Sequence, residues 1–261
     1  MKEYNISLVI FTWLTQASIG LIILRAVYIR MAAAKNIPGK DKQVLLSAFI
    51  LLVAGLLFSF AHLSYPRHAY NAVNNLGSSW MSREILAETV FLSILLLWYF
   101  IARFRIIKIP TIIPELIAVI TGIALLFFMI KTYMLPSIPE LNHPGLPVSF
   151  IITPFLAGSV IIFFLLRKKD PVTALKFKML ATLMFIASLI NFLIFSINQD
   201  DLPLLNLYYV CWLAAAVVLI PSLSATLKNK NIIPDVIFLN LAIICDLLGR
   251  VYTLTYTNPG L

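Results

Sequence analysis

Long apolar runs alternate with short polar connectors along almost the whole chain. The runs are about 20 residues long, the length at which a helix crosses a hydrocarbon core of about 30 Å. They show no two-residue alternation and are too long for the strands of a membrane barrel. The pattern therefore predicts eight transmembrane helices, at roughly Ile6–Tyr28, Val44–Leu63, Ile85–Ala102, Ile112–Ile130, Val148–Leu166, Met179–Ile197, Leu204–Thr226 and Ile232–Tyr252.

Composition narrows the fold class to an all-α integral membrane protein. Of the 261 residues, 61% are apolar and 12% are charged, whereas a soluble domain is about half apolar and about a quarter charged. No stretch is left for a large soluble domain, so we expect a single membrane domain over residues 1–261. The first apolar run exceeds the roughly 7–15 residues of a signal-peptide core, so it is predicted to stay as a span.

The net charge of +9 comes from basic residues in short loops. Fifteen Lys and Arg lie at the ends of the first, third, fifth and seventh helices and in the connectors that follow them, and five lie on the other side. The positive-inside rule places the richer side in the cytoplasm, so both termini are predicted to face outward. The basic runs lack the length and aromatic interleaving of a nucleic-acid-binding segment.

One connector, Phe60–Val90, gathers many of the protein's polar groups. His62 lies near the end of the second apolar run, Ser82 is predicted to cap the third helix, and Glu84 falls in its first turn. Each alone has a simple interpretation, as an interfacial histidine or a helix-terminal carboxylate. Together, at one membrane level, they suggest a site that accepts protons from a lipid-soluble hydroxyl compound.

Further polar residues interrupt other apolar runs. Asp246 and Arg250 are four residues apart and are predicted to form a structural ion pair on one helix face. Gln16 in the first helix, and Lys131 with Tyr133 after the fourth, have two open interpretations: they are contacts between helices or interfacial anchors.

Cysteine and histidine usage argues against a metal centre in this protein. Cys211 and Cys245 each lie inside an apolar run, and there is no C-x-x-C pair to hold an iron–sulfur cluster. Of the three histidines, only His62 lies on a predicted helix, which argues against a bis-histidine haem. We therefore expect no haem or metal here.

Five short stretches together form a recognisable pattern: "FTWLTQASIG" at 11–20, "HL" at 62–63, "YNAVNNLGSS" at 70–79, "SRE" at 82–84 and "DLLGR" at 246–250. The pattern resembles the membrane-anchor subunits of the dimethyl sulfoxide reductase family. That family has a histidine followed by leucine on its second helix, an Asn-rich connector and a Ser-x-Glu start to its third helix. Asp246 stands where the family pattern has a glutamate.

The resemblance implies a role in anaerobic respiration, in a multi-pass anchor of a bacterial or archaeal cytoplasmic membrane. Such an anchor oxidises menaquinol near the outer or periplasmic face and passes electrons to an iron–sulfur subunit. A molybdopterin catalytic subunit then performs the terminal reduction, so the iron–sulfur clusters and the molybdenum cofactor are expected in partner chains. The implied quinol-site residues are His62 and Glu84, with Arg67, Asn71, Asn74 and Ser82 as pocket or partner-contact residues.

Two other classes of function remain open at this point. A secondary transporter would also have eight spans and buried ionisable pairs, although transporter sites tend to lie near the membrane midplane rather than at one face. An adjacent reading frame with ferredoxin-like cysteine motifs would favour the anchor over the transporter. The second class is a membrane assembly factor without redox turnover, and quinol binding would separate it from the anchor.

Overall fold

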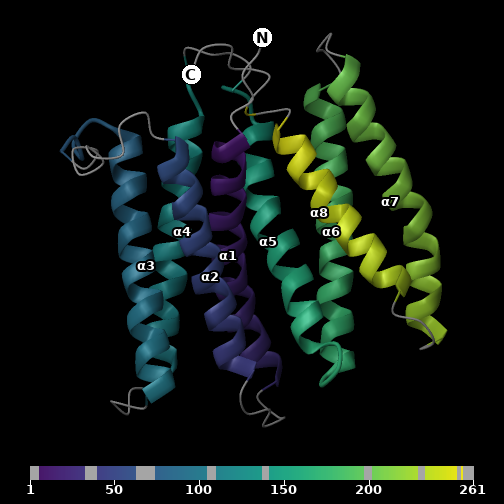
Figure 1. Cartoon of the computed structure of the whole chain (residues 1–261), viewed down its shortest axis with the longest axis horizontal. Helices are drawn as coiled ribbons and strands as arrows, with labels where there is room; N and C mark the ends of the chain where they lie inside the picture. The colour runs from purple at the N-terminus through teal and green to yellow at the C-terminus, as the bar shows by residue number, and fades with distance from the viewer. Residues whose placement is uncertain are drawn as a thin grey trace.

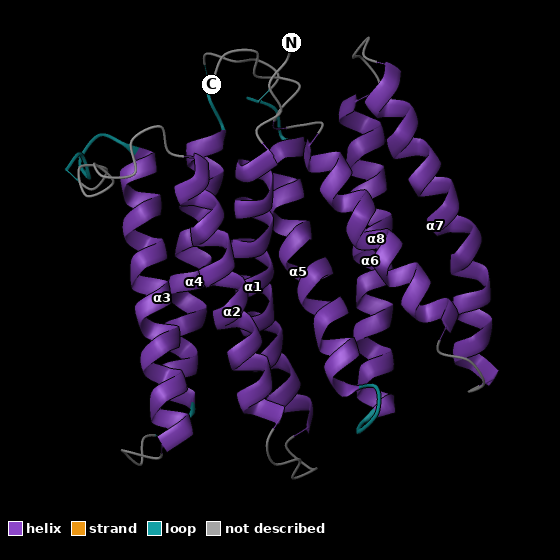
Figure 2. Ribbon diagram, viewed as in Figure 1, coloured by secondary structure: helices purple, strands orange, loops and turns teal. Residues whose placement is uncertain are grey.

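All the regular structure in the described part of the chain is helical (Figure 2). The computed structural model describes residues 6–32, 40–62, 74–104, 110–136, 141–196, 202–228, 233–251 and 254. Each predicted apolar run coincides with a helix in the described part of the chain, which confirms that the eight runs are helical. The helices are α1 (Ile6–Ala32), α2 (Lys40–His62), α3 (Trp80–Phe104), α4 (Ile112–Tyr133), α5 (Gly145–Leu166), α6 (Pro171–Ser196), α7 (Leu202–Lys228) and α8 (Ile233–Val251).

Successive helices run up and down through one bundle (Figure 1). We call the end at which α1 begins the upper end and the opposite end the lower end. Helices α3, α5 and α7 also begin at the upper end, and α2, α4, α6 and α8 finish there. The start of α1 and the end of α8 therefore lie on one side, as an even number of helices requires.

Two glycines let α1 and α5 touch backbone to backbone. A Cβ atom added at Gly20 would lie 1.8 Å from the carbonyl oxygen of Pro154, and one added at Gly158 would lie 2.8 Å from the carbonyl carbon of Gly20. No larger residue fits either position without moving a helix. Small residues of this kind let membrane helices approach closely.

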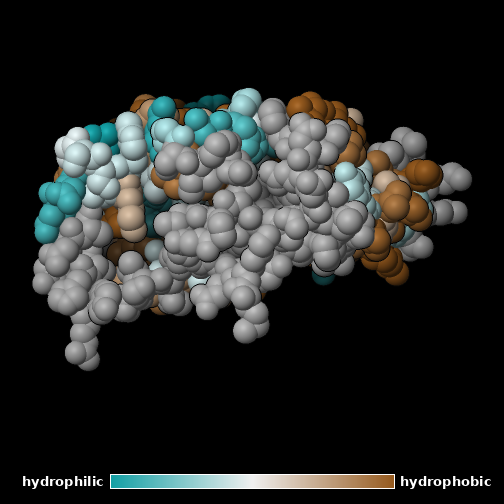
Figure 3. All heavy atoms as spheres, turned by 90° about the horizontal axis from the view of Figure 1, so that it is seen from above, coloured by the Kyte–Doolittle hydropathy of each residue, from teal (hydrophilic) through white to brown (hydrophobic). Residues whose placement is uncertain are grey.

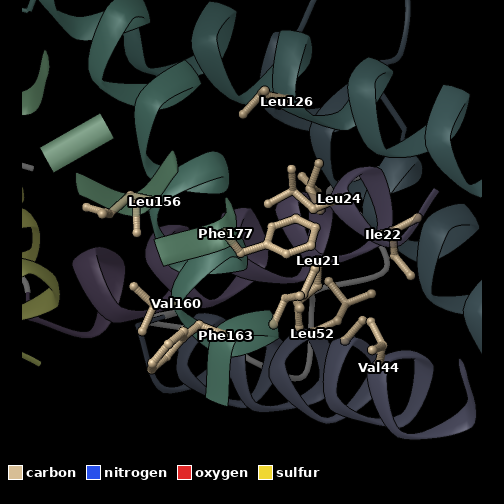
Figure 4. Close-up of a cluster of buried hydrophobic side chains, with 14 of the residues drawn as sticks. Leu21, Ile22, Leu24, Val44, Leu52, Leu126, Leu156, Val160, Phe163 and Phe177 are labelled. Carbon is tan, nitrogen blue, oxygen red and sulfur yellow. The ribbon is translucent and has the colours of Figure 1, made fainter. Parts of the chain in front are cut away.

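The apolar core lies around α1 in the middle of the bundle (Figure 4). Leu21, Ile22 and Leu24 of α1 are at most 3% exposed. Helices on several sides supply their buried neighbours, which include Val44, Leu52, Leu126, Leu156, Val160, Phe163 and Phe177. The central helix is thus covered all round, which leaves its polar side chains to find partners inside the protein.

The outward faces are apolar, as a lipid environment requires. On α4 the exposed large side chains include Leu116, Ile120, Ile123 and Phe127. Seen from the upper end, hydrophobic atoms form the edge where α7 lies, and hydrophilic atoms gather over the start of α3 (Figure 3).

Six described helices, α1 to α6, are long and apolar enough to cross a membrane. The apolar stretch of α7, Tyr209–Ser222, is shorter. Asp235, Asp246 and Arg250 all fall within the 19 residues of α8 and lower its apolar character. That α7 and α8 also span the membrane stays a prediction.

The start of α3 differs from the sequence-based expectation. The helix begins at Trp80, and the Ser79 hydroxyl accepts a hydrogen bond from the backbone N–H of Ser82 at 3.3 Å. A capping residue accepts from the second or third residue of its helix, so Ser79 is the cap. The prediction that Ser82 caps the helix is wrong, because Ser82 is buried in the first turn.

Candidate functional site

The structure describes only part of the predicted quinol site. The backbone of His62 ends α2, but its side chain lies outside the described residues, as do Arg67 and Asn71. Asn74 is exposed in the turn before α3. Ser82 and Glu84 are both 4% exposed, so the described site begins with two buried groups on the first turns of α3.

Glu84 is one of two buried carboxylates on the same face of α3. Glu88, one helical turn deeper, is 2% exposed, and its Oε1 accepts a hydrogen bond from the Thr15 hydroxyl of α1 at 3.1 Å. Glu84 Oε1 is buried and has no hydrogen-bond partner among the described residues. Because buried polar atoms are nearly always paired, an open carboxylate oxygen is a candidate binding atom.

Tyr133, at the end of α4, connects these carboxylates with α8. It lies within electrostatic range of Glu84, Glu88 and Arg250. Its ring centroid lies 5.5 Å from that of Phe150 on α5, and the Arg250 guanidinium lies 4.7 Å from the same Phe150 ring. The sequence placed Tyr133 just after the fourth helix; the structure places it on the helix and inside the bundle.

Asp246 and Arg250 belong to one buried network with α1 and α5. The Thr153 hydroxyl donates to Asp246 Oδ2 at 2.9 Å and accepts from Arg250 Nη2 at 2.8 Å, so it joins the two charged groups. The indole N–H of Trp13 also donates to Asp246 at 3.0 Å, and Arg250 donates to Gln16 Oε1 at 2.7 Å.

We call these residues together the upper network, because all of them lie in the upper half of the bundle. Its members are Trp13, Thr15, Gln16, Glu84, Glu88, Tyr133, Thr153, Asp246 and Arg250. Its buried atoms include the Glu84 Oε1 acceptor and the Gln16 Nε2 donor, which have no hydrogen-bond partner among the described residues. The network can therefore both accept a hydrogen bond from a bound molecule and donate one to it.

At the lower end, α1 and α4 are joined by ion pairs to Glu115 of α4. Arg25 and Arg30 of α1 each donate to one carboxylate oxygen, at 2.8 Å and 2.7 Å. Arg25 is 2% exposed and lies 4.3 Å from the Trp98 ring centroid. Both oxygens of Glu115 are thus satisfied by cations.

A second ion pair joins α6, α7 and α8 in the lower half. Lys178 Nζ bonds Asp235, and it also donates to the backbone carbonyl of Ser222 at 2.8 Å. The Ser222 hydroxyl donates to Asp235 Oδ1 at 2.8 Å. This pair ties both helices of the α7–α8 hairpin to α6.

The charge count over the connectors needs a correction in the light of these contacts. Arg25 and Lys178 are buried in ion pairs and Arg250 in the upper network, so none of the three is a solvated loop charge. Without them thirteen basic residues face four. The asymmetry keeps its direction, and the predicted orientation is unchanged.

Sequence reasoning missed the hydroxyl groups that organise the site. Thr15 and Thr153 are ordinary residues in apolar runs, and nothing in their spacing identifies the carboxylates they bind. The available signal was the density of polar residues in "FTWLTQASIG", because polar groups inside a membrane helix turn toward protein. Within the part of the sequence that the structure describes, no three His, Cys, Asp or Glu residues come together to hold a metal ion.

Comparison with known proteins agrees with the motifs. The family model described as DMSO reductase anchor subunit (DmsC) matches residues 1–250. Anaerobic dimethyl sulfoxide reductase chain YnfH of Escherichia coli K12 is 28% identical over 61% of this chain and 57% of its own length. An anaerobic dimethyl sulfoxide reductase chain of Haemophilus influenzae is 30% identical over 62% of this chain and 59% of its own length.

A shorter match links the protein to a second enzyme. A sulfite dehydrogenase subunit of Allochromatium vinosum is 32% identical over 34% of this chain and 28% of its own length. In all three relatives the matched region is less than two thirds of the protein.

Proposed function

Because this chain belongs to the DMSO reductase anchor subunit family, as its motifs predict, we propose that it oxidises a quinol near the upper end of its bundle and passes the electrons to an iron–sulfur partner. One observation carries the proposal: Glu84, the glutamate of the family motif, is buried and presents a carboxylate oxygen that no described residue binds. A quinol hydroxyl donates a hydrogen bond, and such an oxygen can accept it.

The geometry of α2 supports a role for His62 beside Glu84. A Cβ atom added at Gly55 would lie 2.9 Å from the Thr15 hydroxyl, so this face of α2 packs directly on α1. Residue 62 is seven positions further on, two helical turns along the same face. The helical repeat therefore predicts that position 62 falls on the α2 face that packs on Thr15.

The chemistry follows from what quinol oxidation releases. Each quinol gives up two protons and two electrons. A neutral His62 imidazole accepts a proton from one hydroxyl, and the Glu84 carboxylate accepts the other, as general bases held at the site. The electrons leave for an iron–sulfur cluster in a partner subunit.

The quinol is proposed to be menaquinol, and a molybdopterin subunit is proposed to complete the complex. The names of the two dimethyl sulfoxide reductase relatives point to an S-oxide as the terminal acceptor, which that subunit would bind. By the positive-inside rule the lower end faces the cytoplasm. The upper end and its soluble partners then lie outside the cytoplasmic membrane.

Substitution at the two bases tests the proposed function. In membranes that contain the assembled complex, we expect His62→Gln and Glu84→Gln each to lower quinol-driven turnover by about 10²-fold or more. Activity with a reduced viologen dye, which feeds the soluble subunits directly, should stay near that of the unmodified complex. Ser93→Ala, on the exposed face of α3, is the control.

Equal losses with both donors would show that the two residues are structural. Unchanged quinol-driven turnover in both variants would place the quinol site elsewhere.

Photo-cross-linking tests the partner. A cross-linker at Asn75 or Asn142, both exposed at the upper end, should capture the iron–sulfur subunit. Capture only from Lys168, exposed at the lower end, would contradict both the docking face and the orientation.

A further inference from the structure

Glu88 is a second buried carboxylate that quinol binding alone does not explain. It is 2% exposed and lies four residues after Glu84 on the same face of α3. Side chains with this spacing have their Cβ atoms about 5–6 Å apart. A side-chain rotation spans such a gap, so a proton can move between the two carboxylates.

Thr15 holds Glu88 in place from the neighbouring helix. Its hydroxyl donates to Glu88 Oε1 at 3.1 Å, which orients that carboxylate group. Gly55 of α2 leaves room for that hydroxyl, because a Cβ atom there would lie only 2.9 Å from it. The hydrogen bond to Glu88 therefore forms where α2 packs closely on α1.

The groups that face Glu88 allow it to change its protonation. Within the described residues these are Glu84 on its own helix, Thr15 on α1 and Tyr133 on α4, with Arg250 of α8 beyond Tyr133. The ion pairs found among the described side chains do not include Glu84 or Glu88. Two carboxylates this close in a low-dielectric interior resist being ionised together, so they readily share a proton.

We propose that Glu88 receives the proton that Glu84 takes from the quinol, with Thr15 as the residue that positions it. The O–H bond at Glu84 breaks, an O–H bond forms at Glu88, and Glu84 becomes a carboxylate that can accept again. After the quinone leaves, Glu88 returns the proton through Glu84 to water at the upper end, so both carboxylates are restored for the next turnover. The quinol's electrons go to the iron–sulfur partner and do not pass through these residues. The inference rests on the proposed function and extends it by one step.

The test compares quinol-driven turnover over a range of pH in membranes carrying the assembled complex. We expect Glu88→Gln and Thr15→Val to lower turnover, Glu88→Gln by about tenfold, less than the loss of a direct general base. The loss should be largest at low pH and shrink as pH rises, because Glu84 then loses its proton more easily without a relay. Glu88→Asp, which keeps a carboxylate, should restore part of the turnover and the original pH profile.

The matched control is Thr89→Val. Thr89 follows Glu88 but is exposed, and its hydroxyl bonds its own helix at Ile85. The Thr89→Val variant should therefore change neither the quinol-driven turnover nor its pH profile.

Two results would overturn the relay separately from the proposed function. If Glu84→Gln abolishes quinol-driven turnover while Glu88→Gln and Thr15→Val leave it intact, the site is correct and the relay is wrong. A loss that is the same at every pH, and is shared by dye-driven turnover, would make Glu88 a structural residue. If Glu88→Gln fails to assemble, Thr15→Val and Glu88→Asp still decide by their pH profiles.

Discussion

The upper and lower ends of the bundle bury ionisable groups in different ways. At the lower end two buried carboxylates meet opposite charges: Arg25 and Arg30 satisfy both oxygens of Glu115, and Lys178 pairs with Asp235. At the upper end Glu88 meets the neutral hydroxyl of Thr15.

The contrast distinguishes buried charges that stabilise the fold from a buried carboxylate that can still bind a ligand. A buried charge with a complete set of partners fixes helices and has no capacity left for a ligand. At the upper end Glu84 keeps an oxygen that nothing described binds. A carboxylate with an unsatisfied oxygen adds little to the stability of the fold. A substrate that supplies the missing hydrogen bond explains why the group is buried.

The largest expected effect on stability comes from a substitution in the ion pairs of the lower end. Glu115→Ala leaves Arg25 buried without its partner, which should destabilise the protein by about 3–5 kcal/mol. Thermal unfolding in detergent, with the amount of protein in the membrane as a second measure, checks this. Replacing both Arg25 and Glu115 by Met should recover most of the loss, since a buried pair can be exchanged for apolar residues. If Glu115→Ala were as stable as the unmodified protein, the Arg25–Glu115 ion pair would not have a structural role.

An intermediate effect is expected for Thr153→Val in the upper network. The variant removes one hydroxyl that serves both Asp246 and Arg250, and leaving a buried polar group unsatisfied costs about 1–3 kcal/mol. The same unfolding measurement applies. Thr121→Val, whose hydroxyl bonds its own helix at Ile117, is the matched control and should lose much less. Equal losses would show that Thr153 does not link the two charges.

A still smaller effect on stability should follow Glu84→Gln, although the same change is expected to lower quinol-driven turnover by about 10²-fold or more. The amide keeps the shape of the side chain and removes a charge that the fold must desolvate, so stability should change by no more than about 1 kcal/mol. Thermal unfolding of the quinol-free complex measures it. A loss as large as that of Glu115→Ala would erase the distinction between the two ends.

The smallest effect concerns His143, in the connector between α4 and α5 at the upper end. Burial lowers the pKa of His143, and its Nδ1 accepts the backbone N–H of Gly145 at 3.0 Å. The folded state thus favours the neutral ring, so stability is full above the unfolded pKa of about 6.5 and declines as pH falls below it. Unfolding temperatures at neutral and acidic pH should differ less in His143→Asn. An identical pH dependence in both proteins would exclude His143 as a contributor.

The helices were predictable because membrane length and hydropathy determine them almost alone. The eight apolar runs are eight helices, and the motif around "SRE" pointed to Glu84, whose side chain is buried. The cap was misassigned because Ser79 and Ser82 are chemically alike, and only the backbone shows which one precedes the first turn.

The partners of the buried charges were not predictable in the same way. Arg25 and Lys178 were counted as loop charges because each lies near the end of an apolar run. Their carboxylates, Glu115 and Asp235, lie 90 and 57 residues further along the sequence. Such pairs depend on which helices become neighbours, and the local pattern of a sequence does not contain that information.

The central position of α1 has a consequence for biosynthesis. Ser18 donates to the carbonyl of Ala48 on α2, Thr15 to Glu88 on α3, and Gln16 accepts from Arg250 on α8. The ribosome makes α1 before all of these partners, and lipid offers none in their place. The insertion machinery therefore has to shelter α1, or hold it beside the growing polypeptide, until α8 emerges and supplies Arg250.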